Sequence, residues 1–254
     1  MNSYIKFFDK WYIITINNKN DERITNNLRS IDVSNFEILR YEPAKKIDNV
    51  NKNSSLLQLF SHNSWDETSE NIYQNHLSTI ERGILENRKN IVVLEDDAEI
   101  ILKPNKLKKL VKWLDNNEWD IFFLGHCCWP PISIYINNDI LKPMYPLLAH
   151  AYVINGKSMQ KVLNSFRSYK KTHFDKIFCL SKFNMYACFP SIAFQKKPPA
   201  IFKEISDRLN TNINFNSICY TTERLAIILP FIILFITVFI LYRLIINIRK
   251  NYKK

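Results

Sequence analysis

Short apolar runs that alternate with helical patterns constrain the fold of this 254-residue chain more than any other feature. Trp11–Ile16 (WYIITI), Ile91–Leu94 (IVVL) and Ile121–Leu124 (IFFL) contain almost no polar residue, and Leu147–Ile154 is also strand-like. Strands buried on both faces have such continuous apolar runs, whereas half-solvated strands alternate apolar and polar residues. Buried strands that alternate with helices indicate a single α/β domain with a mostly parallel sheet.

Apolar residues recur every three or four positions between these runs, which predicts amphipathic helices. In Asp66–Asn87, for example, Ile72, His76, Ile80 and Ile84 fall on one face. We expect further helices at Asn20–Ile31, Pro104–Asn116, Ser158–Phe166 and Asp175–Leu180, further strands at Phe36–Arg40 and Met185–Phe189, and a loop at Glu42–Ser55.

A long apolar run near the C-terminus predicts a transmembrane helix. Leu225–Tyr242 contains no charged residue, and Arg224 and Arg243 bracket it. About 17 to 20 apolar residues suffice to cross a bilayer, and Pro230 is tolerated near the first turns of such a helix. A buried core helix is the alternative, but all faces of this run are apolar and a basic tail follows it.

The chain therefore divides into four segments. We expect a globular domain over residues 1–205, a polar linker over 206–222, a transmembrane helix over 223–243 and a basic tail over 244–254. The charged N-terminus has no long apolar stretch typical of a signal peptide, which favours a cytosolic domain. The basic tail favours the opposite orientation, because Lys and Arg prefer the cytoplasmic side.

Composition excludes several classes of site. The chain has only 3 glycines, so neither a P-loop nor a dinucleotide-binding fingerprint can be drawn. The chain has 5 cysteines, an odd number, and none of them has CxxC spacing, which argues against a disulfide framework. The net charge of +11 would suit nucleic acid, a membrane surface or an anionic substrate. Part of that charge lies on Lys103–Lys112, which has the pattern of a solvated helix face, and no nucleic-acid motif is present.

Three adjacent carboxylates form the sharpest chemical feature. Glu95, Asp96 and Asp97 directly follow the IVVL run, and ligands of α/β sheets bind at the carboxyl ends of strands. Hard oxygen ligands suit Mg²⁺ or Mn²⁺, which typically take one or two carboxylates plus substrate phosphates. An acidic, solvated hairpin turn is the alternative, and the fully apolar strand before it argues against that alternative.

Five segments in consistent order resemble glycosyltransferase family 25, which includes lipooligosaccharide and procollagen galactosyltransferases. The resemblance covers about Tyr12 to Gln195. Its central part is the run from His76 to Ile100, HLSTIERGILENRKNIVVLEDDAEI, with Asn75 where the family usually has Ser. The other segments are IITINNKNDER (13–23), WDIFFLG (119–125), HAYVIN (150–155) and the position of Asp175.

The resemblance implies a GT-A-like fold with the acidic cluster at a Mn²⁺ or Mg²⁺ ion, and an inverting transfer with a general base. We assign these roles as follows: metal ligands Glu95 and Asp97; donor-binding residues Asn17, Arg23, His76 and Asp96; catalytic base Asp175.

Each assignment has a structural alternative. Asp175 could cap a helix, Arg23 could be a surface helix residue, and His76 could be a core histidine. His126, Cys127 and Cys128 suggest zinc only weakly, because no second ligand pair accompanies them.

The resulting hypothesis is a membrane-anchored hexosyltransferase. It would transfer galactose or glucose from a UDP-sugar to a hydroxyl of a glycan, a lipid-linked sugar or hydroxylysine. The rivals are a membrane-anchored binding or structural protein with a degenerate transferase fold, and a nucleic-acid-binding protein. Richness in Asn, Ile and Lys is typical of an AT-rich genome, such as that of a large DNA virus or an AT-rich microbe.

Overall fold

The structure is a computed structural model of the chain. The structure describes residues 6–15, 28, 33, 35–40, 67–101, 104–128, 132–169, 172, 174–195 and 215–251.

An eight-stranded sheet forms the centre of the domain, in the order β2-β1-β3-β10-β5-β11-β8-β7. Its strands are β1 Lys10–Thr15, β2 Phe36–Arg40, β3 Asn90–Glu95, β5 Ile121–Phe123, β7 Ser133–Asn137, β8 Ile140–Pro143, β10 Ala151–Asn155 and β11 Met185–Cys188. Two small antiparallel sheets pair β4 (Ala98–Ile100) with β12 (Ala193–Gln195), and β6 (Cys127–Cys128) with β9 (Pro146–Leu147).

The large sheet is mixed. β1 pairs in parallel with β2 and β3, and β5 pairs in parallel with β11. β10 is antiparallel to both β3 and β5, and β8 is antiparallel to both β11 and β7. Six strands therefore point one way, and β10 and β8 point the other. The amino end of β10 consequently lies beside the carboxyl ends of β3 and β5.

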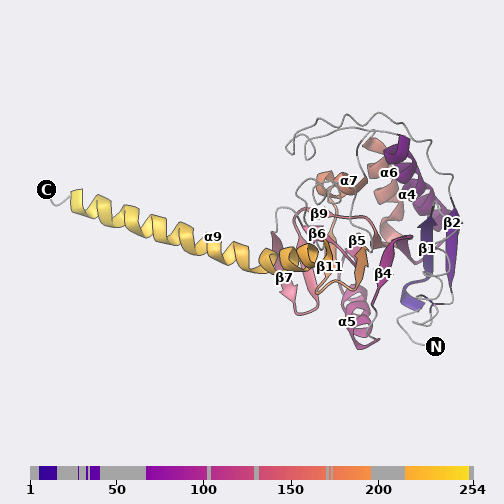
Figure 1. The fold of residues 1–254 in the computed structure, drawn as a ribbon, viewed down its shortest axis with the longest axis horizontal. Helices are drawn as coiled ribbons and strands as arrows, with labels where there is room; N and C mark the ends of the chain where they lie inside the picture. The colour runs from indigo at the N-terminus through magenta and orange to yellow at the C-terminus, as the bar shows by residue number, and fades with distance from the viewer. Residues whose placement is uncertain are drawn as a thin grey trace, which may run out of the picture.

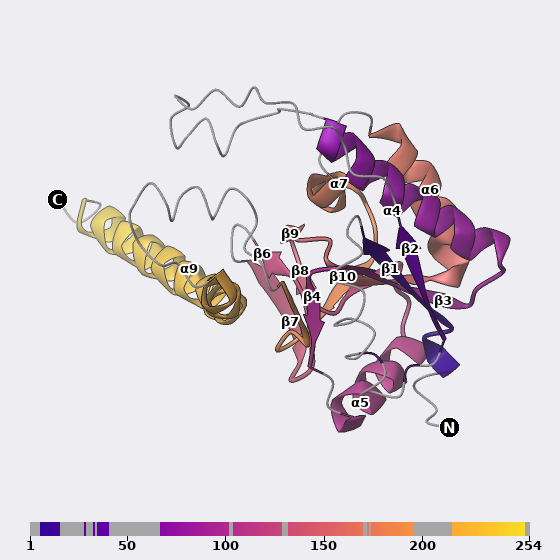
Figure 2. The same cartoon turned by 45° about the vertical axis from the view of Figure 1, so that its right-hand side comes forward.

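Helices cover both faces of the sheet (Figure 2). One core packs α4 (Glu67–Leu85), α6 (Met159–Ser168) and α7 (Phe174–Leu180) against Tyr12, Val93 and Tyr152. The other packs α5 (Pro104–Asp115) against Trp11 and Val92. Neighbouring residues of one strand thus enter different cores, as the two-residue period of a strand requires. This explains why these runs are apolar at consecutive positions.

Most elements expected from the sequence are confirmed within one or two residues in the described part of the chain. The lysine-rich helix is amphipathic as expected, since Leu107, Leu110 and Leu114 of α5 are buried. The expected sheet is mostly parallel; the observed sheet is mixed, because the HAYVIN strand, β10, enters it antiparallel. The β7–β8 hairpin was not expected. The helix at Asn20–Ile31 and the loop at Glu42–Ser55 lie largely or wholly outside the described residues.

A single long helix, α9 (Phe215–Asn251), follows the domain and projects away from it (Figure 1). The segment Ser217–Arg243 has a mean hydropathy of 2.9 and is long and apolar enough to cross a membrane. Its apolar window is unburied in the domain. The helix begins at Phe215, inside the range expected for the linker.

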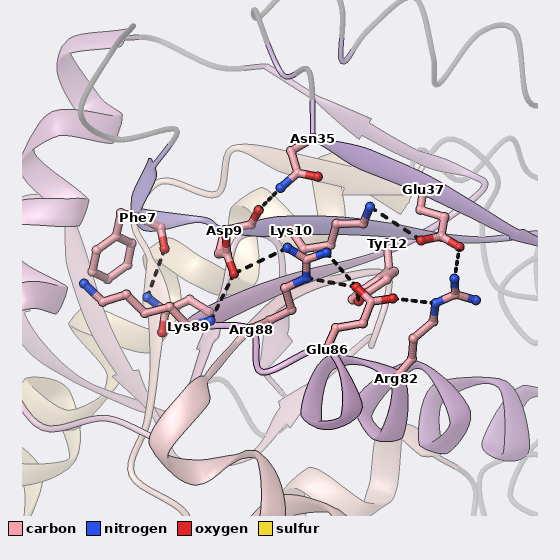
Figure 3. Close-up of polar contacts among 11 residues, drawn as sticks. Phe7, Asp9, Lys10, Tyr12, Asn35, Glu37, Arg82, Glu86, Arg88 and Lys89 are labelled. Carbon is pink, nitrogen blue, oxygen red and sulfur yellow. Dashed lines mark hydrogen bonds and ion pairs between the residues drawn. The ribbon is translucent and has the colours of Figure 1, made fainter.

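An ionic network lies near the amino ends of strands β1 and β2, beside the end of α4 (Figure 3). Glu86 accepts hydrogen bonds from Tyr12 Oη at 3.0 Å, Arg82 Nε at 2.9 Å and Arg88 Nη2 at 2.8 Å. Arg82 also pairs with Glu37 at 2.6 Å. The network joins the connection between α4 and β3 to strands β1 and β2. It lies at the amino ends of these strands, whereas the acidic cluster lies at the carboxyl end of β3.

Replacing Glu86 by glutamine should lower stability in a pH-dependent way. Partial burial acts to raise the pKa of Glu86, but hydrogen bonds from Arg88, Arg82 and Tyr12 outweigh it and hold that pKa at about 2. A depressed pKa stabilises the fold above the ordinary value of 4.5, and this contribution is lost as the pH falls towards 2. We expect Glu86→Gln to cost about 1 kcal/mol at pH 7 and progressively less below pH 4.5.

Thermal unfolding of the detergent-solubilised chain at pH 7, 5 and 3 measures this. The control is Glu81→Gln on α4, which removes an exposed ion pair to Arg167 of α6 and should cost under about 0.5 kcal/mol. Equal, pH-independent losses in both variants would contradict the role given to Glu86.

Candidate functional site

The acidic cluster lies at the carboxyl end of β3, as expected, in a turn that leads into β4. The main chain of Glu95 donates from its N–H to the carbonyl of His150 at 2.9 Å, which joins the end of β3 to the start of β10. Thr15, the last residue of β1, donates its hydroxyl to Asp96 Oδ2 at 2.8 Å. Three neighbouring strands therefore fix the position of the acidic turn.

His76 connects the acidic turn to the helix layer. It is buried on α4, with its Nδ1 2.8 Å from Tyr152 Oη and its Nε2 3.3 Å from Glu95 Oε1. Its ring stacks on Phe174 with centroids 3.9 Å apart. Burial lowers the pKa of His76 to about 3, although Asp175 acts to raise it, so the ring is neutral at pH 7. We assign the remaining proton to Nε2, because this lets His76 donate to Glu95 while Tyr152 donates to Nδ1.

Asp97 is held by a residue from the far end of the domain. Gln195 Nε2, on β12, donates to Asp97 Oδ2 at 3.0 Å, and Gln195 pairs with Ala98 across the small sheet. Gly125 permits this close approach of β12. A Cβ there would lie 2.0 Å from the carbonyl oxygen of Ala193 and 2.5 Å from His150 Nε2. A glycine is therefore required where the chain leaves β5.

Asp175 reaches the same region from the first turn of α7. Its Oδ1 accepts a hydrogen bond from the main-chain N–H of Ala149 at 2.9 Å. The preceding residue, Leu148, has a φ of 73°, a left-handed conformation that is strained for a bulky side chain. Asp175 thus supports a strained turn as well as facing the site. Burial, followed by the negative charge of Glu95, raises the pKa of Asp175 to about 6.

A cavity of about 190 Å³ connects these groups. Its lining combines carboxylates, an amide, an imidazole and apolar side chains. The residues that line it are Ser69, Ile72, Glu95, Leu148, Ala149, His150, Phe174, Asp175 and Gln195. The cavity therefore has Glu95 and Asp175 on its walls and borders the Gln195–Asp97 contact.

Negative charge is concentrated and poorly compensated in the acidic turn. Burial, followed by the charge of Asp96, raises the pKa of Glu95 to about 7. Burial, followed by the charge of Glu95, raises the pKa of Asp97 to about 7 as well. Among the described residues, no hydrogen-bond donor reaches the buried Asp97 Oδ1 or Gln195 Oε1. Two buried acceptors without donors are a chemical environment that favours a bound cation or a hydroxyl-rich ligand.

A metal would need ligands beyond these side chains. In the part of the chain that the structure describes, no three His, Cys, Asp or Glu side chains could hold a metal ion together. Mg²⁺ and Mn²⁺ sites that carry nucleotides use one or two carboxylates, and substrate phosphates and water complete the shell. Glu95 and Asp97 fit that smaller requirement, and the unpartnered Asp97 Oδ1 is an acceptor of the right kind.

The structure brings most of the expected site residues together. Glu95 and Asp175 line the cavity, and His76 contacts Glu95 from α4. Asp96 and Asp97 lie in the turn that follows Glu95. Asn17 and Arg23 lie outside the described residues.

Sequence reasoning missed Thr15, Gln195 and His150. The position of Thr15 at the end of a buried strand was the one available signal, because strand ends carry ligand sites.

Two of the residues considered for zinc, His126 and Cys127, have other partners. His126 Nδ1 lies 3.3 Å from Ser191 Oγ and 3.6 Å from Glu223 Oε1, and all three side chains are buried. Cys127 Sγ lies 3.6 Å from Thr222 Oγ1. These contacts join the first turns of α9 to the domain.

Comparisons with known proteins give only distant similarities. No family model and no curated protein matches the chain. Among solved structures, it is similar to a protein described as a glucose-1-phosphate thymidylyltransferase from Bacillus anthracis, in complex with sucrose. The TM-score is 0.39 at 12% identity, over 81% of this chain and 96% of that one.

Two further solved structures match at similar levels. A glycosyltransferase involved in glycosylation of the major capsid of PBCV-1 has a TM-score of 0.38 at 9% identity, over 80% of this chain and 98% of that one. HddC from Yersinia pseudotuberculosis, complexed with GMP-PN, has a TM-score of 0.34 at 10% identity, over 78% and 77%. TM-scores below 0.5 carry no functional assignment, so the assignment depends on the residues of the site.

Proposed function

We propose that this chain is a glycosyltransferase that moves a hexose from a UDP-sugar to an acceptor hydroxyl with the help of Mn²⁺ or Mg²⁺. One observation carries the proposal: a crowded acidic turn at the carboxyl end of β3 borders a cavity that also has a half-buried carboxylate, Asp175, on its wall. A cation site and a separate proton acceptor are the two groups that an inverting transfer from a nucleotide sugar requires.

Glu95 and Asp97 would hold the metal, which when bound would neutralise charge on the departing diphosphate. The surrounding residues keep both carboxylates in place. His76 donates to Glu95, Gln195 donates to Asp97, and Thr15 holds Asp96 beside them. Each of these partners is a neutral donor, so it orients a carboxylate without supplying the positive charge that the acidic turn lacks.

Asp175 would act as the general base. The acceptor oxygen attacks the anomeric carbon of the hexose, and the bond from that carbon to the diphosphate oxygen breaks with its electron pair leaving on the diphosphate. The hydroxyl proton passes to the Asp175 carboxylate. A base works best when its pKa lies near the working pH, and burial moves the pKa of Asp175 in that direction.

The C-terminal helix would anchor the enzyme in a membrane. We propose that α9 spans a bilayer over Leu225–Tyr242, with the globular domain in the cytosol. The support is the length, apolarity and exposure of the helix. The acceptor would be a glycan, a lipid-linked sugar or hydroxylysine.

Metal-dependent donor binding tests the proposal most directly. UDP is titrated calorimetrically into the full chain in detergent, once with Mn²⁺ and once with a chelator. We expect at least about tenfold tighter binding with Mn²⁺, because diphosphate and carboxylates share the ion. Equal affinities under both conditions would sink the metal-assisted mechanism. Absence of UDP binding, together with salt-sensitive binding of DNA, would favour the nucleic-acid alternative.

A further inference from the structure

The base of α9 packs against the domain. Glu223 is buried and accepts hydrogen bonds from the hydroxyl of Ser191 and, at 3.3 Å, from its main-chain N–H. One residue earlier, Thr222 is buried beside Cys127 of β6, and Cys219 is buried one turn before it. α9 also contacts β7. The helix is continuous from these contacts into its apolar part.

The apolar run begins almost where these contacts end. Glu223 is buried in the domain and Leu225 is exposed, and two helical residues span about 3 Å along the axis. If α9 crosses a bilayer, the membrane surface must therefore lie directly against the face of the domain from which the helix leaves. Tyr220 and Arg224 are exposed at this level, with the guanidinium 4.5 Å from the ring centroid. Tyrosine is enriched at membrane–water interfaces.

The same face carries exposed apolar side chains. Large apolar side chains are exposed mainly on or beside the β7–β8 hairpin. Of those described outside α9, more than half lie in residues 134–145. They are Ile134, Tyr135, Ile136, Met144 and Tyr145. β7 is the last strand of the sheet, and Figures 1 and 2 both show it next to the base of α9. A patch of this kind marks an interaction surface, and its neighbour here is a candidate membrane helix.

We infer that the β7–β8 hairpin is a second membrane contact, which inserts its apolar and tyrosine side chains into the lipid headgroup layer beside α9. The inference rests on α9 spanning a bilayer and is independent of the transferase chemistry. Aromatic and aliphatic side chains on an edge strand suit the interface, because their apolar surface leaves water while the tyrosine hydroxyls stay hydrated. The contact would fix the orientation of the domain on the membrane.

Site-specific photo-crosslinking to lipid tests the inference. Benzoylphenylalanine replaces Tyr135 or Ile136, two adjacent positions that point to opposite faces of the strand. It also replaces Phe235 of α9, as a reporter for the span, and Leu85 at the end of α4, as an exposed control away from α9. Each full-length variant is reconstituted into vesicles of phosphatidylcholine and phosphatidylglycerol, irradiated and analysed by mass spectrometry for lipid adducts.

We expect lipid adducts at Phe235 and at one or both hairpin positions, and none at Leu85. Adducts at Phe235 without any at the hairpin would overturn the inference, and so would hairpin adducts to a second copy of the protein instead of lipid. Absence of adducts at Phe235 would overturn both this inference and the proposed membrane anchor. The same preparation is also tested for UDP binding. If it binds UDP but gives no adduct at Phe235, the membrane anchor fails while the proposed transferase function stands.

Discussion

Replacing Asp97 by asparagine should remove most of the metal dependence of UDP binding and leave the fold intact. Asparagine keeps an oxygen that can accept the hydrogen bond from Gln195, now 3.0 Å long, so the small β4–β12 sheet should persist. It removes the charge that a cation requires. Loss of residues that merely orient metal ligands costs about 10- to 100-fold in metal affinity, so loss of a ligand should cost about 100-fold or more.

The measurement is calorimetric titration of UDP with and without Mn²⁺, on the variant and on Glu99→Gln. Glu99 is a good control because it lies two residues away on β4 with its side chain exposed. The control should bind as the unmodified chain does. If Asp97→Asn retains a full Mn²⁺ effect, then Asp97 is not a ligand. Loss of binding with a changed thermal midpoint would instead indicate damage to the β4–β12 sheet.

The fold was predictable from the sequence where a single physical signal decided each element. The runs at Ile91–Leu94 and Ile121–Leu124 are apolar at every position, because alternate residues enter two different cores. A strand with one solvated face would instead carry polar residues at alternate positions. Strand direction has no such signal. β10 is as apolar as β3, yet it runs antiparallel, because the chain makes an excursion through β6–β9 before it returns between β3 and β5.

The site was predictable where its residues are adjacent in the chain, and not where the fold brings them together. The acidic cluster follows a buried strand and was visible in the sequence. Gln195 reaches Asp97 from 98 positions away, through a pairing of two three-residue strands that carry no clear pattern. The role of His150 depends on the antiparallel direction of β10, which places the carbonyl of His150 beside Glu95.

The hairpin at the base of α9 shows a further limit of sequence patterns. Ser133–Asn137 has three consecutive exposed residues, Ile134 to Ile136, where a strand in the middle of a sheet would bury at least one. From sequence alone the segment resembles the buried strands. Its position at the edge of the sheet makes the difference, and that position is set by pairings of β8 and β11 far along the chain.

Replacing Asp175 by asparagine should lower sugar transfer by ~10²- to 10⁴-fold, the usual cost of losing a general base, with little change in Mn²⁺-dependent UDP affinity. The residue has a competing structural role, because its Oδ1 accepts the hydrogen bond from Ala149 beside the strained Leu148. Asparagine separates the two roles. Its side-chain oxygen can still accept from Ala149, but the amide cannot take a proton from an acceptor hydroxyl.

Turnover and donor affinity must therefore be measured on the same protein. UDP release from UDP-galactose and UDP-glucose gives the turnover, calorimetry gives the affinity, and thermal unfolding checks the turn at Leu148. Asp115→Asn, an exposed aspartate at the end of α5, is the matched control and should behave as the unmodified chain. Near-normal turnover would remove Asp175 from the mechanism. Lost UDP binding with an unchanged thermal midpoint would move it to the donor site, because a proton acceptor contributes to the reaction step and not to donor binding.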